Sequence, residues 1–157
     1  MSKEWYDIPK ETKIRAYTQV AEDTGIATYA VEKDWWVVQI LSAIFEMEVG
    51  KYLIFKGGTS LSKAWNLIER FSEDIDLAFD RAYLGFDGET TRSGVKVLRK
   101  KTGKYISKTF APELEARLKQ NGLTEIILNY VTPEASDADP AQIQIYYPNV
   151  VDYPGYV

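Results

Sequence analysis

The sequence predicts an α+β fold, close to the α/β class, in which helices pack on a small mixed sheet. Three observations predict it. Apolar residues recur at helical spacing along much of the chain, short apolar runs bounded by turn residues lie between these stretches, and 157 residues suffice for one buried core. Apolar residues make up 45% of the chain and charged residues 27%, as in ordinary globular proteins. We therefore expect residues 1–157 to form a single domain.

The strongest helical pattern covers residues 31–48, which carry two apolar stripes. Trp35 and Phe45 belong to the first stripe, and Trp36 and Ile40 belong to the second. A helix that is apolar on two sides is expected to be buried on two sides. The other predicted helices cover residues 10–23, 59–69, 94–107 and 112–120.

Four strands are expected between these helices, at residues 52–56, 75–79, 124–131 and 142–147. The last of them alternates apolar and polar residues, which indicates a half-exposed strand. The first two enclose the helix of residues 59–69. The centre of the chain therefore has the order strand, Gly-Gly turn, helix, strand, and this segment is the most informative one for function.

The residue types that are missing restrict the chemistry. The chain has no cysteine and no histidine, which excludes disulfides, cysteine–zinc sites, the Ser-His-Asp triad and imidazole ligands. Carboxylates, hydroxyls, lysines and arginines around Mg²⁺ or Mn²⁺ remain. No apolar run is long enough to span a membrane, and the first residues lack the apolar core of a signal peptide. We therefore expect a cytoplasmic protein with no membrane partner.

The glycine turn after the first strand is a candidate phosphate site. Gly57 and Gly58 let the backbone approach a ligand closely, and the next helix opens with Thr59 and Ser60. A helix start offers unpaired N–H groups, hydroxyls and the positive end of the helix dipole to a phosphate. The alternative is an ordinary turn, because strand-to-helix turns use glycine and helix starts use threonine or serine.

Two aspartates follow at the start of the second strand. Side chains alternate along a strand, so Asp74 and Asp76 project to one face while Ile75 and Leu77 enter the core. Two neighbouring carboxylates repel each other unless a cation bridges them, and Mg²⁺ accepts one or two carboxylates together with phosphate oxygens. A solvated strand end is the alternative. The joint occurrence of the turn and the aspartate pair favours chemistry on a nucleoside triphosphate (NTP).

A basic stretch is the second candidate site, although the net charge of the chain is −4. Residues 92–108 hold seven positive charges and no acid. Local charge governs binding to a polyanion, so we expect this stretch to bind RNA, with a solvated helix face as the alternative. Four lysines recur every four residues and would line one face of the helix: Lys96, Lys100, Lys104 and Lys108.

Residues 55–64 and 70–77 together resemble the signature of the DNA polymerase β-like nucleotidyltransferase superfamily, in which a Gly-Gly or Gly-Ser turn, a short helix and Asp-x-Asp follow one another. The sequences of these two segments, FKGGTSLSKA and RFSEDIDL, are similar to those of the AbiEii/AbiGii branch of toxin nucleotidyltransferases. Residues 32–35, Glu-Lys-Asp-Trp, also resemble that branch. The resemblance covers about residues 30–80 and is specific as a combination rather than in any single part.

The resemblance implies a toxin of an abortive-infection or toxin–antitoxin system that transfers a nucleotide from an NTP to an acceptor, with an RNA such as tRNA as the expected acceptor, and that has a cognate antitoxin. Asp74 and Asp76 would be the catalytic residues and the ligands of Mg²⁺ or Mn²⁺. Solvated surface or turn roles are the alternatives for Lys33, Arg70 and Ser72. The residues expected to bind nucleotide phosphates are Lys33, Gly57, Gly58, Thr59, Ser60, Arg70 and Ser72.

One departure concerns the third carboxylate, which the superfamily places on a later strand. The strand predicted at 142–147 has no acid, and Glu125 and Asp152 are poorly placed. Residues 154–157 also look like the start of another strand, so we expect the chain to be the N-terminal part of a longer protein, inactive when isolated. A non-catalytic module that binds nucleotide or a partner protein is the alternative function.

Overall fold

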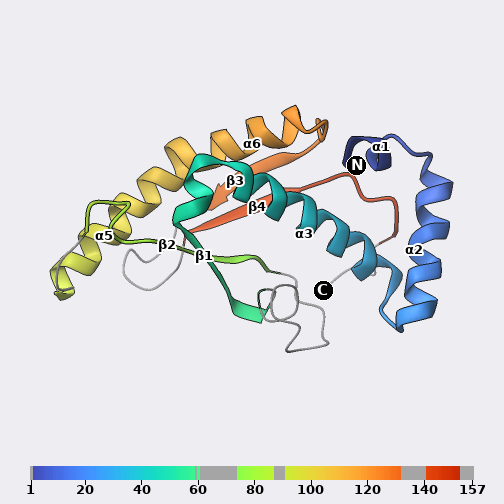
Figure 1. Cartoon of the computed structure of the whole chain (residues 1–157), viewed down its shortest axis with the longest axis horizontal. Helices are drawn as coiled ribbons and strands as arrows, with labels where there is room; N and C mark the ends of the chain where they lie inside the picture. The colour runs from blue at the N-terminus through green and yellow to red at the C-terminus, as the bar shows by residue number, and fades with distance from the viewer. Residues whose placement is uncertain (1, 59, 61–73, 87–90, 132–140, 153–157) are drawn as a thin grey trace.

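A computed structural model of the chain describes residues 2–58, 60, 74–86, 91–131 and 141–152 (Figure 1). It confirms the α+β class. The helices are α1 (Ser2–Tyr6), α2 (Lys10–Thr24), α3 (Thr28–Glu46), α5 (Arg92–Tyr105) and α6 (Ala111–Gln120), with a 3-10 helix η1 (Glu48–Tyr52) and a π-helix η2 (Ile106–Phe110). The strands are β1 (Leu53–Lys56), β2 (Asp76–Phe79), β3 (Ile127–Val131) and β4 (Gln142–Tyr146). Most of the helix predicted at 59–69 lies outside the described residues.

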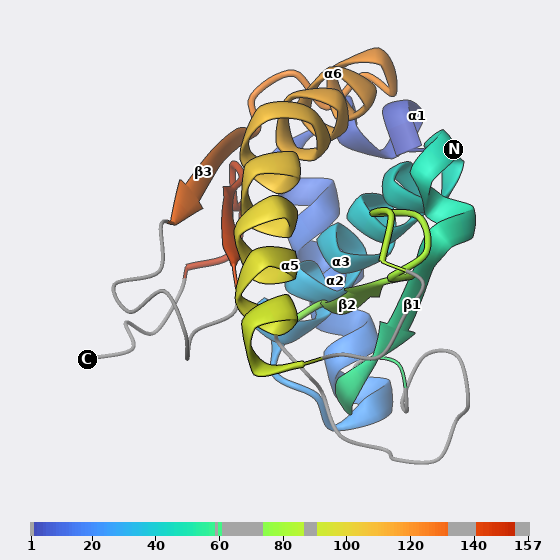
Figure 2. The same cartoon turned by 90° about the vertical axis from the view of Figure 1, so that its left-hand side faces the viewer.

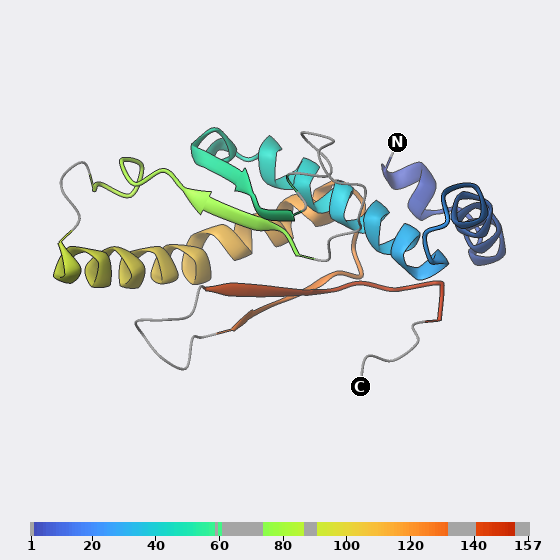
Figure 3. The ribbon, with the colours of Figure 1, turned by 90° about the horizontal axis from the view of Figure 1, so that it is seen from below.

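The described strands form two antiparallel pairs instead of the single mixed sheet expected from the sequence. β1 pairs with β2, and β3 pairs with β4. Figure 3 shows the two pairs as separate layers. Strand spacing in the sequence indicates which segments are extended, but it carries no information on which strand edges meet, and this is why the described strands pair differently from the expected mixed sheet.

The long helix α3 passes through the centre of the molecule (Figure 1) and buries one side only. Trp36 and Ile40 of the second predicted stripe are 3% and 5% exposed, and they belong to the core. On the first stripe, Val38 and Phe45 remain 43% and 44% exposed. The expectation of two buried sides was therefore wrong for this face, because the core cluster with α6 and the strands lies on the side of Trp36.

The two helices predicted at 94–107 and 112–120 are one continuous run of helical backbone. α5 passes through η2 into α6 with right-handed helical angles at Tyr105, Ile106, Phe110 and Ala111, and Figure 2 shows the run along one side of the molecule. Proline has no N–H to bond the carbonyl four residues earlier, and Pro112 stands in the first turn of α6. The preceding π turn is a natural place to absorb this loss, because π turns occur as single wide turns inside α-helices.

The core lies between α3, η2, α6 and the inner faces of the strands. Its fully buried side chains include Leu114, Leu118 and Leu123. Ile75, Leu77 and Phe79 pack against this cluster from the β2 side, and they anchor the strand that carries the aspartates. In the described part of the chain, no helix is both long and apolar enough to cross a bilayer.

Candidate active site

The glycine turn and the second aspartate meet in the structure. β1 and β2 pair in antiparallel register, with Lys56 opposite Asp76, so Gly57 emerges from β1 beside the start of β2. A methyl group at Gly57 would overlap Oδ2 of Asp76 and lie 2.9 Å from its Cγ. The two sequence signals, which are separated by a predicted helix, therefore form one site.

Glycine is required at position 57 for two independent reasons. Its φ angle is +76°, which lies in the left-handed region that side-chain-bearing residues avoid. It also leaves the space that the Asp76 carboxylate occupies. The sequence argument for a close backbone approach was therefore sound, but the group that approaches Gly57 within the protein is a carboxylate of the neighbouring strand.

Ser60 supports the turn from inside. Its side chain is among the buried polar groups, at 4% exposure, and its hydroxyl donates a hydrogen bond of 3.1 Å to the backbone oxygen of Phe55. This bond ties the segment after the turn to β1. The predicted contact between Ser60 and a phosphate remains a prediction, and only the oxygen lone pairs of this hydroxyl are left for a ligand.

The predicted alternation of the aspartate strand is confirmed. Asp74 and Asp76 are exposed, whereas Ile75 and Leu77 are half-buried against the core. Both carboxylates consequently project on the solvent side of the strand, and that of Asp76 lies against Gly57. The alternation holds although the paired strand begins only at Asp76.

This donor set fits Mg²⁺ or Mn²⁺ as a partial site. Two carboxylates of one strand face are the protein ligands with which Mg²⁺ commonly binds a substrate phosphate. Among the residues that the structure describes, no three acidic side chains come together as a metal-binding group. A metal at Asp74 and Asp76 would therefore complete its coordination with phosphate oxygens and water.

The other predicted nucleotide-binding residues are placed in part. Thr59, Arg70 and Ser72 lie outside the described residues. Gly58 follows Gly57 in the turn, and Lys33 lies half-buried on α3. Their contacts with a phosphate remain predictions.

The third carboxylate is not found among the described candidates. β4 forms as expected, pairs with β3 rather than with β2, and carries Gln142 and Gln144 where an acid was sought. Glu125 lies beside α1, where burial and the nearby Glu125 charge raise the pKa of the Tyr6 hydroxyl. Asp152 is exposed after β4.

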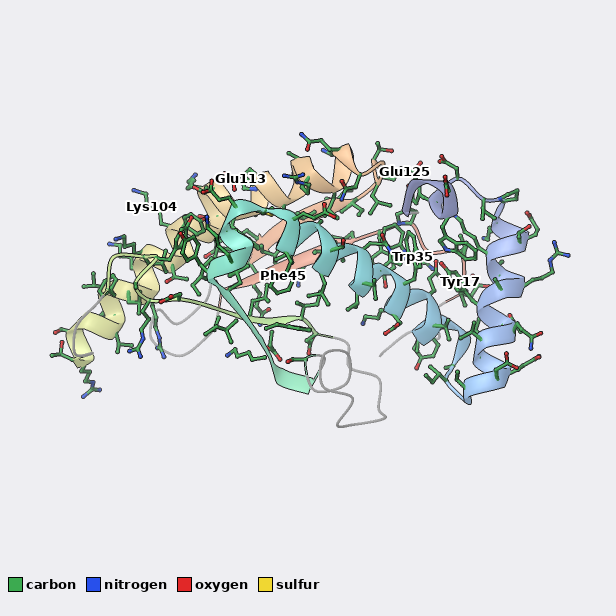
Figure 4. The ribbon with its side chains drawn as sticks, viewed as in Figure 1. Tyr17, Trp35, Phe45, Lys104, Glu113 and Glu125 are labelled. Carbon is green, nitrogen blue, oxygen red and sulfur yellow. The ribbon has the colours of Figure 1, made fainter. Side chains whose placement is uncertain are left out.

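The four lysines of the predicted RNA-binding face lie on the continuous α5–η2 helix, and all four are exposed. No residue of α5 is buried, and Figure 4 shows Lys104 projecting outward from the helix. Aromatic side chains pack α5 and η2 against β2 and against the loop that follows β2. Phe79 makes edge contacts with Tyr105 and Phe110, at centroid distances of 5.5 and 5.8 Å, and Tyr105 contacts Tyr83 at 5.8 Å. Binding of RNA to this face remains a prediction.

Glu32, the first residue of the 32–35 segment that resembles the toxin branch, is a carboxylate only 3% exposed, and its structural role was not predicted. Its two oxygens accept hydrogen bonds from the backbone N–H groups of Val150 and Val151, at 2.8 and 2.9 Å. A buried carboxylate needs such partners, because an uncompensated charge is costly in the interior. Glu32 therefore fixes the chain after β4 on α3.

An α+β fold with a glycine turn packed against Asp76 is consistent with the nucleotidyltransferase-like class that the resemblance predicts. The profile of the family described as "Nucleotidyl transferase AbiEii toxin, Type IV TA system" matches residues 39–155, and the chain belongs to this family. The predicted family is thereby confirmed, together with the general class of a toxin nucleotidyltransferase, and a toxin–antitoxin system implies an antitoxin partner. Neither a curated protein nor a solved structure matches the chain.

Proposed function

We propose that this chain is a metal-dependent nucleotidyltransferase that transfers a nucleotide from an NTP to an acceptor, with RNA such as tRNA as the acceptor class. The observation that carries the proposal is the contact of Gly57 with the Asp76 carboxylate. It supports a single site in which a phosphate-binding turn and a metal-binding strand act on the same triphosphate.

In this site, the backbone N–H groups of Gly58, Thr59 and Ser60 and the hydroxyl of Thr59 would hold the β- and γ-phosphates. Asp74 and Asp76 would hold Mg²⁺ or Mn²⁺, whose chemistry is neutralisation of phosphate charge. A hydroxyl of the acceptor attacks the α-phosphorus, and pyrophosphate leaves. Because phosphoryl transfer relies on positioning and electrostatics, the chain mainly has to orient the triphosphate.

The exposed lysines of α5 and η2 would hold the acceptor RNA. Contacts between lysine and phosphate are independent of sequence and sensitive to salt, which suits an acceptor recognised by its backbone. All four lysines are exposed, and no residue of α5 is buried. The lysine face is therefore accessible along its length.

A second candidate is a non-catalytic module that retains the nucleotidyltransferase fold and uses it to bind nucleotide or a partner protein. The observation that favours it is the lack of a group of three acids among the described residues. Nucleotide binding without transfer is the result that would select it.

The metal site is tested by calorimetric titration of NTP with and without Mg²⁺. The double variant Asp74→Asn/Asp76→Asn is compared with Glu22→Gln/Asp23→Asn, which removes two exposed charges from α2. We expect Mg²⁺-dependent binding to be lost only in the first variant. Equal affinity in the two variants would reject the metal site.

Catalysis is tested separately with labelled NTP and total RNA. Transfer of label by the wild type and its loss in Asp76→Asn would establish the reaction. Binding of NTP that depends on Asp74 and Asp76, with no transfer of label, would support the binding module instead.

A further inference from the structure

A cavity of about 280 Å³ lies between the N-terminal helices, α3 and the segment after β4. Its walls come from parts of the chain that are distant in sequence and that share no residue with the glycine turn or the aspartate pair. Most of the lining precedes residue 39, where the family match begins. The lining side chains that matter for its chemistry are Trp5, Tyr6, Lys13, Glu32, Trp35 and Glu125.

The apolar walls of the cavity are aromatic rings held in fixed orientations. Trp5 packs edge-on against Tyr17 at 5.7 Å, and its indole nitrogen donates to the Tyr17 hydroxyl at 3.0 Å. Trp35 packs edge-on against Trp36 at 4.9 Å. Figure 4 shows Trp35 and Tyr17 in the space between α3 and α2. Trp5 and Trp35 are only half-buried, so part of each indole remains open to a ligand.

The polar groups of the cavity are balanced in charge. Lys13 donates to the backbone oxygen of Tyr6 and lies over the Tyr6 ring, 5.1 Å from its centroid, while Lys10 is exposed at the rim. The anions of the lining are Glu32, which accepts from two backbone N–H groups, and Glu125, whose charge lies close enough to Tyr6 to raise the pKa of its hydroxyl. Two cations and two anions favour no strongly charged ligand, but they offer donors and an acceptor to a neutral ring.

Burial lowers the pKa of Lys13, although nearby Glu32, Asp7 and Glu125 oppose this shift. Burial likewise raises the pKa of Tyr17. Both directions indicate a partly desolvated interior, in which hydrogen bonds and ring contacts are stronger than in water.

We propose that this cavity binds a nucleobase, either of a free nucleotide or of an unpaired position in an RNA strand. A nucleobase is flat and neutral and carries both donors and acceptors, so it can stack on Trp35 or Trp5, accept from Lys10 and donate to Glu125. The volume lies just below the range of about 300–1,000 Å³ of typical ligand pockets. It therefore suits one ring system and not a whole NTP.

The test measures binding of the four nucleoside monophosphates and of a short unstructured RNA by NMR titration in EDTA. Without a divalent metal, the predicted metal site cannot contribute, and the Asp76→Asn background isolates the cavity further. Saturable binding of monophosphates identifies a free nucleotide as the source, and binding of RNA alone identifies an unpaired base. This inference does not rest on the proposed transferase activity, so the binding experiment tests it independently of the transfer assay.

The decisive variant is Trp35→Ala, which should weaken binding by roughly 5- to 150-fold, the range of base–aromatic stacking. Trp35→Phe should retain most of the affinity, because a ring for stacking remains. Tyr146→Ala removes an aromatic ring that is 55% exposed on β4 and should leave binding unchanged.

If Trp35→Ala does not fold, the surface variants Lys10→Ala and Glu125→Gln replace it, each with an expected loss of about 2- to 10-fold, as for one hydrogen bond. The inference is overturned if none of the ligands binds saturably. It is also overturned if a folded Trp35→Ala variant binds as tightly as the wild type. If the Trp35→Ala variant is unfolded, unchanged binding in both Lys10→Ala and Glu125→Gln overturns it.

Discussion

Replacement of Gly57 by alanine tests the central geometry of the candidate site. The first effect is backbone strain, since alanine at a φ of +76° occupies the left-handed region at a cost of about 1–2 kcal/mol. For a domain of this size, each kcal/mol lowers the melting temperature by about 2–4 °C. We therefore expect Gly57→Ala to melt about 2–8 °C below the wild type.

The second effect is displacement of the Asp76 carboxylate. The new methyl group overlaps Oδ2 and stands 2.9 and 3.0 Å from Cγ and Cβ of Asp76, so the carboxylate must move by roughly an ångström. Misplacement of about 1 Å in a reacting complex can reduce the rate by about 100-fold. Mg²⁺-dependent NTP binding and transfer activity should therefore fall much more steeply than stability.

The matched control is Gly25→Ala. Gly25 ends α2 with a φ of +72°, but an added methyl group there has no atom within 4 Å. Gly25→Ala therefore introduces the backbone strain of a positive φ without any steric overlap of the new methyl group. Differential scanning calorimetry should show a similar loss of stability in the two variants, whereas titration with NTP and Mg²⁺ should show a defect only in Gly57→Ala. Unchanged nucleotide affinity in a folded Gly57→Ala protein would refute the reasoning.

Three further predictions concern single interactions. Glu32→Gln should lower the free energy of unfolding by about 1–3 kcal/mol in urea titrations, because an amide cannot accept from both backbone N–H groups; the exposed Glu22→Gln should change it by less than about 0.5 kcal/mol. Ser60→Ala should cost about 0.5–1.5 kcal/mol through the lost bond to Phe55, and a wild-type melting curve would contradict this. Lys100→Ala should reduce the slope of log K for single-stranded RNA against log salt by about 0.7, and an unchanged slope would exclude this lysine from the contact.

Local patterns predicted the elements of the candidate site well. The alternation of residues 74–77 predicted which side chains enter the core, because a strand has a period of two whatever it pairs with. The helical stretches of α2, α3 and α6 were likewise predicted from apolar spacing and stop signals. These features depend on residues within a few positions of one another.

Structural features that depend on residues distant in the chain could not be predicted from local sequence patterns. The pairing of strands decides that Gly57 contacts Asp76, and nothing near either residue encodes that pairing. The continuity of α5 with α6 was missed because Pro112 looks like a helix start. A π turn stands before Pro112, and the helical backbone continues through it. The partners of Glu32 are more than a hundred residues away, beyond the reach of any periodic pattern.

Glu32 and Asp76 show why burial, rather than residue type, decides which acid can serve chemistry here. Glu32 is enclosed, and two backbone N–H groups already satisfy its oxygens, so a cation at this position would have to displace hydrogen bonds that hold the chain after β4. Asp76 is exposed, and its carboxylate lies against Gly57, which has no side chain to cover it. A divalent ion can approach that carboxylate without breaking the fold. The loss of Glu32 should consequently be seen in stability, and the loss of Asp76 in nucleotide binding.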